Sequence, residues 1–241
     1  MKPRYLVLGA AAVLAAASLT GCARIVPTGP MSSESPEIDG VTAVELNTAG
    51  DLTITQGEPA LTIHAREGVL DILTADVVDG VLKLDRRPGP LPVNFGDGDV
   101  RYELSLPSLD AIEVHGAGDV DAEVATSSGG ELRIVVTGAG DVDVDGIDAE
   151  TVSISISGVG DVEVSGAARS LAVAIDGTGE VDADNLEVVD AEVEISGTGD
   201  AHVFASGTLR ADVSGLGTVY YRGGPEVDAD VSGLGEVVED E

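Results

Sequence analysis

The sequence predicts an all-β protein, most of it a parallel β-solenoid of the right-handed β-helix type, with an irregular β-rich cap at the N-terminal end. Three observations predict this fold. A Gly-x-Gly motif recurs at nearly constant spacing, and short runs of alternating apolar and polar residues flank each copy. Aromatic residues make up only 2% of the chain and tryptophan is absent, so small aliphatic side chains must fill a narrow core. Self-similarity at such a period is typical of stacked repeats.

The motif occurs seven times, and its first glycines are 22, 20, 19, 20, 18 and 18 residues apart. Apolar residues alternate with polar ones before each copy and again after it, which is the pattern of half-buried strands. Each repeat therefore predicts a rung of two short strands, with a second corner about eight residues after the first glycine. The first glycines are Gly116, Gly138, Gly158, Gly177, Gly197, Gly215 and Gly233, and the second corners are expected at Gly146, Gly166, Asn185 and Gly223.

The N-terminus has the features of an export signal over residues 1–21. Two basic residues precede an apolar run that is short for a transmembrane helix. The run ends in Leu19-Thr20-Gly21-Cys22, which resembles the bacterial lipobox, and Cys22 is the single cysteine of the chain. We expect lipidation at Cys22, followed by a flexible Pro- and Ser-rich tether over residues 22–37. The alternative is an ordinary cleaved secretory peptide with an incidental cysteine.

The rest of the chain divides into two parts in this interpretation. Residues 38–107 are strand-rich but irregular and contain a Pro- and Gly-rich loop at 87–99. Residues 108–241 contain the regular rungs. Because a solenoid needs an atypical end to protect its open sheet edges, we expect the first part to cap the stack.

The formal net charge is −32, and from Asp110 onward there are 30 Asp or Glu residues against four Arg. Such a surface repels phosphate backbones, which argues against nucleic-acid binding. It also repels anionic lipid, so the folded part should stay away from the membrane that anchors it.

Aligning the repeats places acidic side chains in columns that follow the second glycine. Equivalent residues of a parallel stack lie about 4.8 Å apart. One interpretation is a site for divalent cations, calcium above all, with carboxylates as ligands. The other is a solvated acidic face with no bound ion, so that the protein has no cofactor. The candidate metal ligands are Asp119, Asp141, Asp161, Glu180, Asp121, Asp143, Glu163 and Asp182.

The residue before the first glycine is mostly Ser or Thr, as at Ser157 and Ser196. This column could donate hydrogen bonds to a glycan, or it could satisfy the backbone of the corners. Sequence signals for catalysis are weak. The Gly-x-Gly copies lack the third glycine of a dinucleotide-binding loop, and no Gly-x-Ser-x-Gly elbow occurs. We therefore expect no catalytic residues.

The segment 100–120, Val-Arg-Tyr-Glu-Leu-Ser-Leu-Pro-Ser-Leu-Asp-Ala-Ile-Glu-Val-His-Gly-Ala-Gly-Asp-Val, resembles the "putative auto-transporter adhesin, head GIN" family, as do Gln56-Gly57 and the strand at 79–84. The resemblance covers the chain from about Ile38 onward. The resemblance implies a β-solenoid-like fold, frequent lipoprotein signals and a role in adhesion. It assigns no catalytic residue to any position of this sequence.

Together these features predict a non-catalytic binding or adhesion module, exported and held by its lipid on the extracytoplasmic face of the cell envelope. Its partners would be the membrane, through the anchor, and a glycan or a surface protein. The first alternative is a calcium-binding structural protein of the envelope. The second is a polysaccharide-processing enzyme, since parallel β-helices can carry carboxylate pairs.

Overall fold

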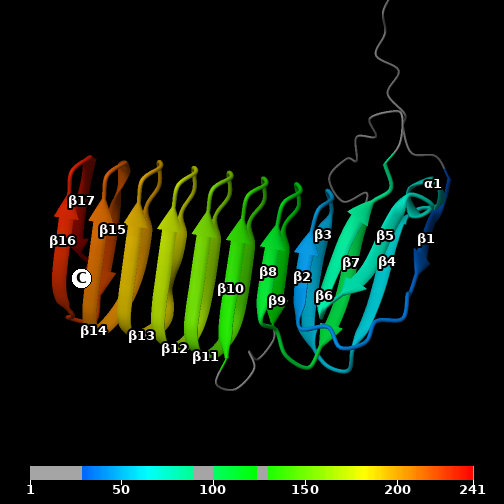
Figure 1. Ribbon diagram of the computed structural model, residues 1–241, viewed down its shortest axis with the longest axis horizontal. Helices are drawn as coiled ribbons and strands as arrows, with labels where there is room; N and C mark the ends of the chain where they lie inside the picture. The colour runs from blue at the N-terminus through cyan, green and yellow to red at the C-terminus, as the bar shows by residue number, and fades with distance from the viewer. Residues whose placement is uncertain (1–28, 89–99, 124–129, 241) are drawn as a thin grey trace, which may run out of the picture.

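The computed structural model describes residues 29–88, 100–123 and 130–240, which form one row of stacked rungs (Figure 1). Almost every regular element is a strand, and α1 (Glu67–Leu70) is a single helical turn. No helix in the described residues is long and apolar enough to cross a membrane. The strands are β1 (Met31–Glu34), β2 (Ala43–Leu46), β3 (Asp51–Gln56), β4 (Ala60–Arg66), β5 (Leu73–Val78), β6 (Val81–Arg86), β7 (Val100–Leu106), β8 (Ala111–Val114), β9 (Val120–Glu123), β10 (Glu131–Val136), β11 (Val142–Ile156), β12 (Val162–Ile175), β13 (Val181–Ile195), β14 (Ala201–Val213), β15 (Leu216–Arg222), β16 (Glu226–Val231) and β17 (Leu234–Glu239).

Successive repeats pair in parallel and in register, which confirms the predicted β-solenoid. Val142, for example, lies opposite Val120 on one side and Val162 on the other. The rungs have two faces. Face A consists of the strands before each corner, with β6, which pairs with β2: β2, β6, β8, β10, β16 and the C-terminal halves of β11 to β14. Face B consists of the strands after each corner, with β7, which pairs with β3: β3, β7, β9, β15, β17 and the N-terminal halves of β11 to β14.

The first rungs do not stack in chain order. The rung β2–β3 lies between β6–β7 and β8–β9, since β2 pairs with both β6 and β8 and β3 pairs with both β7 and β9. After β3 the chain forms β4 and β5 of the cap and then β6 and β7. It next passes the β2–β3 rung to reach β8 on the other side of that rung. The Asp110 backbone N–H donates to the Thr42 carbonyl at 2.7 Å on this passage.

The N-terminal end of the stack is capped, as the sequence predicted. There the parallel pattern stops: β4 runs antiparallel to β7, β5 antiparallel to β6, and β1 antiparallel to β4. Antiparallel strands close the core at this end, and α1 lies beside them (Figure 1). Residues 38–107 thus contribute two regular rungs as well as the cap.

One continuous core of aliphatic side chains runs through the rungs. Strand β10 shows the expected alternation, with Leu132, Ile134 and Val136 buried and the residues between them more exposed. Tyr102 is the only buried aromatic side chain among the described residues. Period-two alternation in a parallel stack places each column of aliphatic residues directly above the next, so the narrow core needs no large side chain.

The Gly-x-Gly corners are glycine because neighbouring rungs approach too closely for a side chain. A Cβ at Gly158 would lie 2.1 Å from the Gly138 carbonyl oxygen, and one at Gly138 would lie 1.9 Å from that of Gly116. The same contact joins Gly116 to Thr48, whose segment Thr48-Ala49-Gly50 is an eighth copy of the corner. The Gly-x-Gly pattern does not include this copy because threonine replaces its first glycine.

The second corners differ among themselves. Gly146, Gly166 and Gly223 have φ of +79°, +130° and +96°, a region that L-residues with a side chain rarely adopt. Asn185, predicted as an equivalent corner, does not have positive φ. The chain turns there without positive φ, next to a register shift between β12 and β13 that lies between Glu163 and Ser165.

Candidate functional site

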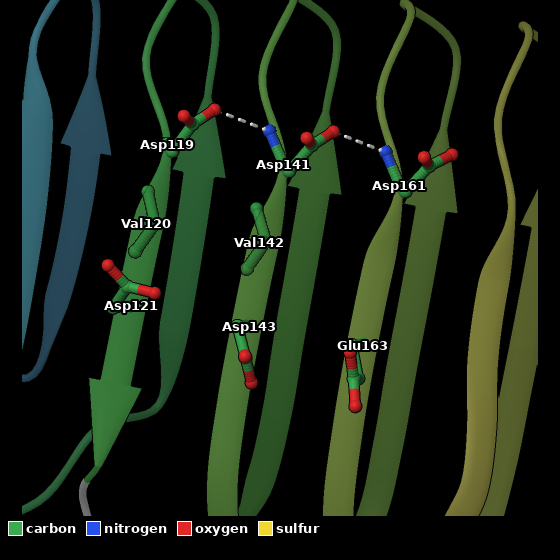
Figure 2. A pocket seen from close by; sticks show the side chains of 8 residues that line it. All are labelled: Asp119, Val120, Asp121, Asp141, Val142, Asp143, Asp161 and Glu163. Atoms are coloured by element: carbon green, nitrogen blue, oxygen red, sulfur yellow. Dashed lines mark hydrogen bonds between the residues drawn. The ribbon is translucent and has the colours of Figure 1, made fainter.

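All eight predicted acidic residues lie on face B, in two parallel columns. The first acidic column contains Asp119, Asp141, Asp161 and Glu180 and continues to Asp200; the second contains Asp121, Asp143, Glu163 and Asp182. Figure 2 shows six of them on three neighbouring rungs, with Val120 and Val142 between the columns. These residues line a depression of about 390 Å³. The structure therefore brings together every acidic residue that the repeat alignment selected.

The first acidic column has a structural role that the sequence did not reveal. The Asp141 backbone N–H donates to Asp119 Oδ1 at 3.1 Å, and the Asp161 backbone N–H donates to Asp141 Oδ1 at 2.9 Å (Figure 2). Asp161 Oδ1 accepts from Glu180 at 2.7 Å in the same way, and Asp200 Oδ1 from Thr218 at 2.6 Å. Each of these four aspartates thus binds the backbone of the next rung just after the glycine corner, where the ladder between strands is interrupted.

Neighbouring carboxylates of the second acidic column repel one another. Asp143 lies opposite Asp121 and Glu163 in the register of the rungs. Partial burial, with the charges of Asp145 and Asp121, raises the pKa of the Asp143 carboxyl. The negative charge of Asp143 is the main cause that raises the pKa of Glu163. In this column, like charges repel along the stack.

The carboxylates form lines and not a closed cage. Within the described part of the chain, no group of three or more His, Cys, Asp or Glu side chains is arranged to hold a metal ion. Calcium normally takes six to eight oxygen ligands. A cation on face B would therefore lie between rungs, with carboxylates of two neighbours and water completing its shell.

The hydroxyl column before the corners makes hydrogen bonds along the stack. His115 Nδ1 and Thr137 Oγ1 are 2.6 Å apart, and the Ser196 hydroxyl donates to Asp176 Oδ1 at 2.5 Å. Of the two predicted uses of this column, these contacts favour the structural one.

The second acidic column ends in an aromatic pair that sequence analysis did not single out. His202 follows Asp182 in the column and Tyr220 follows His202, with ring centroids 4.5 Å apart and planes 16° from parallel. On the neighbouring outward column, Arg222 Nη2 lies 2.9 Å from Asp184 Oδ2. Composition is the sequence signal that could have indicated this region, because three of the six aromatic residues in the chain lie close together there, namely Phe204, Tyr220 and Tyr221.

A protein-family model with the description "putative auto-transporter adhesin, head GIN domain" matches residues 41–225. The chain belongs to this family. The match spans the cap and nearly all the rungs, so the predicted resemblance is confirmed. The family's description as a putative adhesin supports an adhesion or binding role.

Solved structures share the fold. A putative adhesin from Bacteroides fragilis is 23% identical, with a TM-score of 0.77, over 89% of this chain and 99% of that one. A putative lipid binding protein from Parabacteroides distasonis is 21% identical, with a TM-score of 0.67, over 90% and 100%. A putative adhesin from the same organism is 19% identical, with a TM-score of 0.66, over 89% and 98%. Among curated proteins, none matches this chain.

Proposed function

We propose that this protein is a lipid-anchored, non-catalytic adhesion module of the cell envelope and that face B is its binding surface. The observation that carries the proposal is the continuity of the two acidic columns over successive rungs. A surface of this kind offers the same group at every rung, so it suits an extended or repetitive partner better than a small substrate. Membership of an adhesin family supports the same role.

The partner that fits face B is a glycan or a surface protein presenting hydroxyl or amine groups. Carboxylates accept hydrogen bonds from both, and the bonds to charged donors are the stronger ones. Polyanions such as nucleic acids are repelled by the same surface. Recognition would then be spread over several rungs, with a modest contribution from each.

The anchor in this proposal is the acylated Cys22, which lies outside the described residues, as do residues 1–21 and most of the tether at 22–37. Each acyl CH₂ buried in the membrane contributes about 0.8 kcal/mol, so two or more chains hold a protein firmly. Export to the extracytoplasmic face and the length of the tether would place face B away from the anionic membrane surface.

The test compares two triple variants that remove equal charge from opposite faces. Asp121→Asn, Asp143→Asn and Glu163→Gln neutralise face B, whereas Glu194→Gln, Asp212→Asn and Asp230→Asn neutralise three adjacent, exposed carboxylates on face A. Beads coated with each chain are applied to immobilised dextran, polylysine and heparin. We expect the face-B variant to lose at least tenfold in retention on dextran or polylysine, and the face-A variant to keep it. Equal loss in both variants, or no retention of the parent chain, would reject the proposal.

A second candidate function is the binding of divalent cations along face B. The specific observation in its favour is the raised pKa of both Asp143 and Glu163, since a cation between them would relieve the repulsion that raises these values. A ligand that binds only the folded state stabilises it by about 2.7 kcal/mol at a hundred times its Kd. Thermal unfolding of the full chain with calcium, magnesium or chelator tests it: a rise in Tm specific to calcium supports a site, and equal small effects of both ions oppose it.

The enzyme alternative is weaker for a chemical reason. A glycoside-cleaving pair needs one carboxyl with a raised pKa and one that stays ionised. On face B the pKa values of Asp143 and Glu163 are displaced in the same direction. Asp143 and Glu163 therefore do not form an acid and base pair of this kind.

A further inference from the structure

The two ends of the solenoid are built differently. At the N-terminal end the antiparallel strands β1, β4 and β5, with α1, cover the core. At the other end β16 pairs only with β14 and β17 only with β15 among the described residues (Figure 1). Both strands of this last rung therefore present a row of backbone N–H and C=O groups without a neighbouring strand, which is a template for pairing with another chain.

The core continues into this open rung and is exposed there. Val227 and Val231 lie in the same columns as Leu209 and Val213. The inner pair is 1% and 0% exposed, whereas Val227 is 37% and Val231 42% exposed. Aliphatic side chains in core columns gain by burial, at about 25 cal/mol per Å². One more strand stacked on β16 would bury them.

The outward columns indicate which residues such a strand should carry. In one column Arg210 lies between two acids: its Nε is 3.6 Å from Glu192 Oε1, and its Nη1 is 3.6 Å from Asp228 Oδ2. The sign of the charge thus alternates over these three rungs, and a basic residue on a strand next to β16 would be attracted to Asp228. In the next column Glu194, Asp212 and Asp230 follow one another without any basic residue, so a cation beyond Asp230 would be attracted as well.

We propose that the open rung binds an extended segment of a partner protein by strand addition to β16, and that this segment alternates apolar residues with Lys or Arg. Backbone hydrogen bonds to the free edge would supply affinity, and the alternating side chains would supply specificity. The apolar residues continue the columns of Val227, Ala229 and Val231, and the basic ones lie beyond Asp228 and Asp230. The pattern reads the same in parallel and antiparallel orientation.

Charge argues against a second copy of this chain at the same edge. The last rung carries Glu226, Asp228, Asp230, Glu236 and Glu239, and joining two such rungs would place like charges against one another. Like charges directly opposite in a sheet are destabilising. The occupant is therefore a basic segment of a different protein.

The experiment titrates the full chain with fluorescein-labelled Val-Lys-Val-Arg-Val-Lys-Val and follows fluorescence anisotropy. A second peptide has the same sequence with alternate backbone nitrogens methylated, so that it keeps its charge but cannot form a strand ladder. We expect saturable one-to-one binding of the first peptide and at least tenfold weaker binding of the second. Equal affinities would mean that the acidic protein merely attracts cations, and the proposal would fail.

Variants locate the site. Val231→Lys, at the open rung, should weaken binding of the unmethylated peptide at least tenfold. Its matched control is Val78→Lys on β5, since Val78 is 50% exposed at the other end of the stack. The double variant Asp228→Lys, Asp230→Lys should instead bind Val-Glu-Val-Glu-Val-Glu-Val. Equal weakening by both valine variants, or no gain of the acidic peptide by the charge-reversed chain, would overturn the assignment. Because face B is unchanged in these variants, the result is independent of the adhesion test.

Discussion

The Thr48 hydroxyl and the Tyr102 hydroxyl are 2.9 Å apart in the buried core, at the point where the column of corner glycines ends. Thr48 occupies the position that is glycine in the seven later corners. A side chain fits there because, in the stack, β2–β3 is the first rung with such a corner, so no earlier corner carbonyl lies where its Cβ must go. This hydrogen bond joins the first corner to β7, next to the cap.

Replacing Tyr102 by Phe should destabilise the protein by about 1–2 kcal/mol, because the buried Thr48 hydroxyl loses its partner. Urea unfolding followed by circular dichroism measures the loss. Thr48→Val should cost a similar amount, and the double variant should cost less than the sum, since both changes remove one bond. Strict additivity would show that the hydroxyls do not stabilise one another.

Stability should fall at alkaline pH because of Tyr102. Burial raises the pKa of Tyr102 to about 12, from 10.0. The folded state holds the Tyr102 proton more tightly than the unfolded state does. The contribution of this group to the free energy of unfolding is therefore fully present below pH 10 and is lost as the pH rises toward 12, by about 1.4 kcal/mol per pH unit. Unfolding measured between pH 9 and 12 should show this slope in the parent chain, and Tyr102→Phe should flatten it. An unchanged slope in that variant would assign the effect to other groups.

Two glycine-to-alanine changes should differ sharply in cost. Gly158→Ala drives a Cβ into the Gly138 carbonyl oxygen at 2.1 Å, so the rungs must separate, and we expect a loss of about 3 kcal/mol. At Gly146 a Cβ meets nothing within 4 Å, and the cost is the positive φ alone, about 1–2 kcal/mol. Thermal unfolding of both variants compares them. Equal losses would mean that close approach does not explain the corner glycines.

Neutralising Asp143 should stabilise the protein at neutral pH. The pKa of its carboxyl is raised in the folded state, so ionisation becomes unfavourable to folding as the pH rises above about 4. Asp143→Asn should gain less than about 1 kcal/mol at pH 7 in low salt, because solvent screens exposed charges. The gain should vanish at pH 3 and shrink in 1 M salt. Denaturant midpoints under the three conditions test this, and a loss of stability at pH 7 would contradict it.

Changing Cys22 to Ala should release the protein from the membrane. Without an acylated cysteine the exported chain has only its acidic surface, which anionic lipid repels. Fractionation of cells expressing each form, with mass spectrometry of the mature N-terminus, measures the effect. Retention of Cys22→Ala in the membrane fraction would show that another element provides the anchor.

Much of the fold follows from local sequence alone. Alternation around the corners assigns residues such as Val142 and Val162 to the core and Asp143 and Glu163 to the outside, because successive side chains of a strand point to opposite faces. A constant period then fixes the register, which places Asp143 and Glu163 in one column. The acidic face was predictable for this reason.

Tertiary structure decided which strands meet. Alternation states which side of a strand is buried but not which strand lies next to it, so the position of β2–β3 between β6–β7 and β8–β9 could not be read from the pattern. The hydrogen bonds from the Asp161 and Asp141 backbones to the preceding rung depend on the same stacking. So does the exposure of Val231, whose pattern is that of a core residue. The sequence by itself determined the rung and its two faces, whereas the order of the first rungs and the open edge arose from long-range pairing.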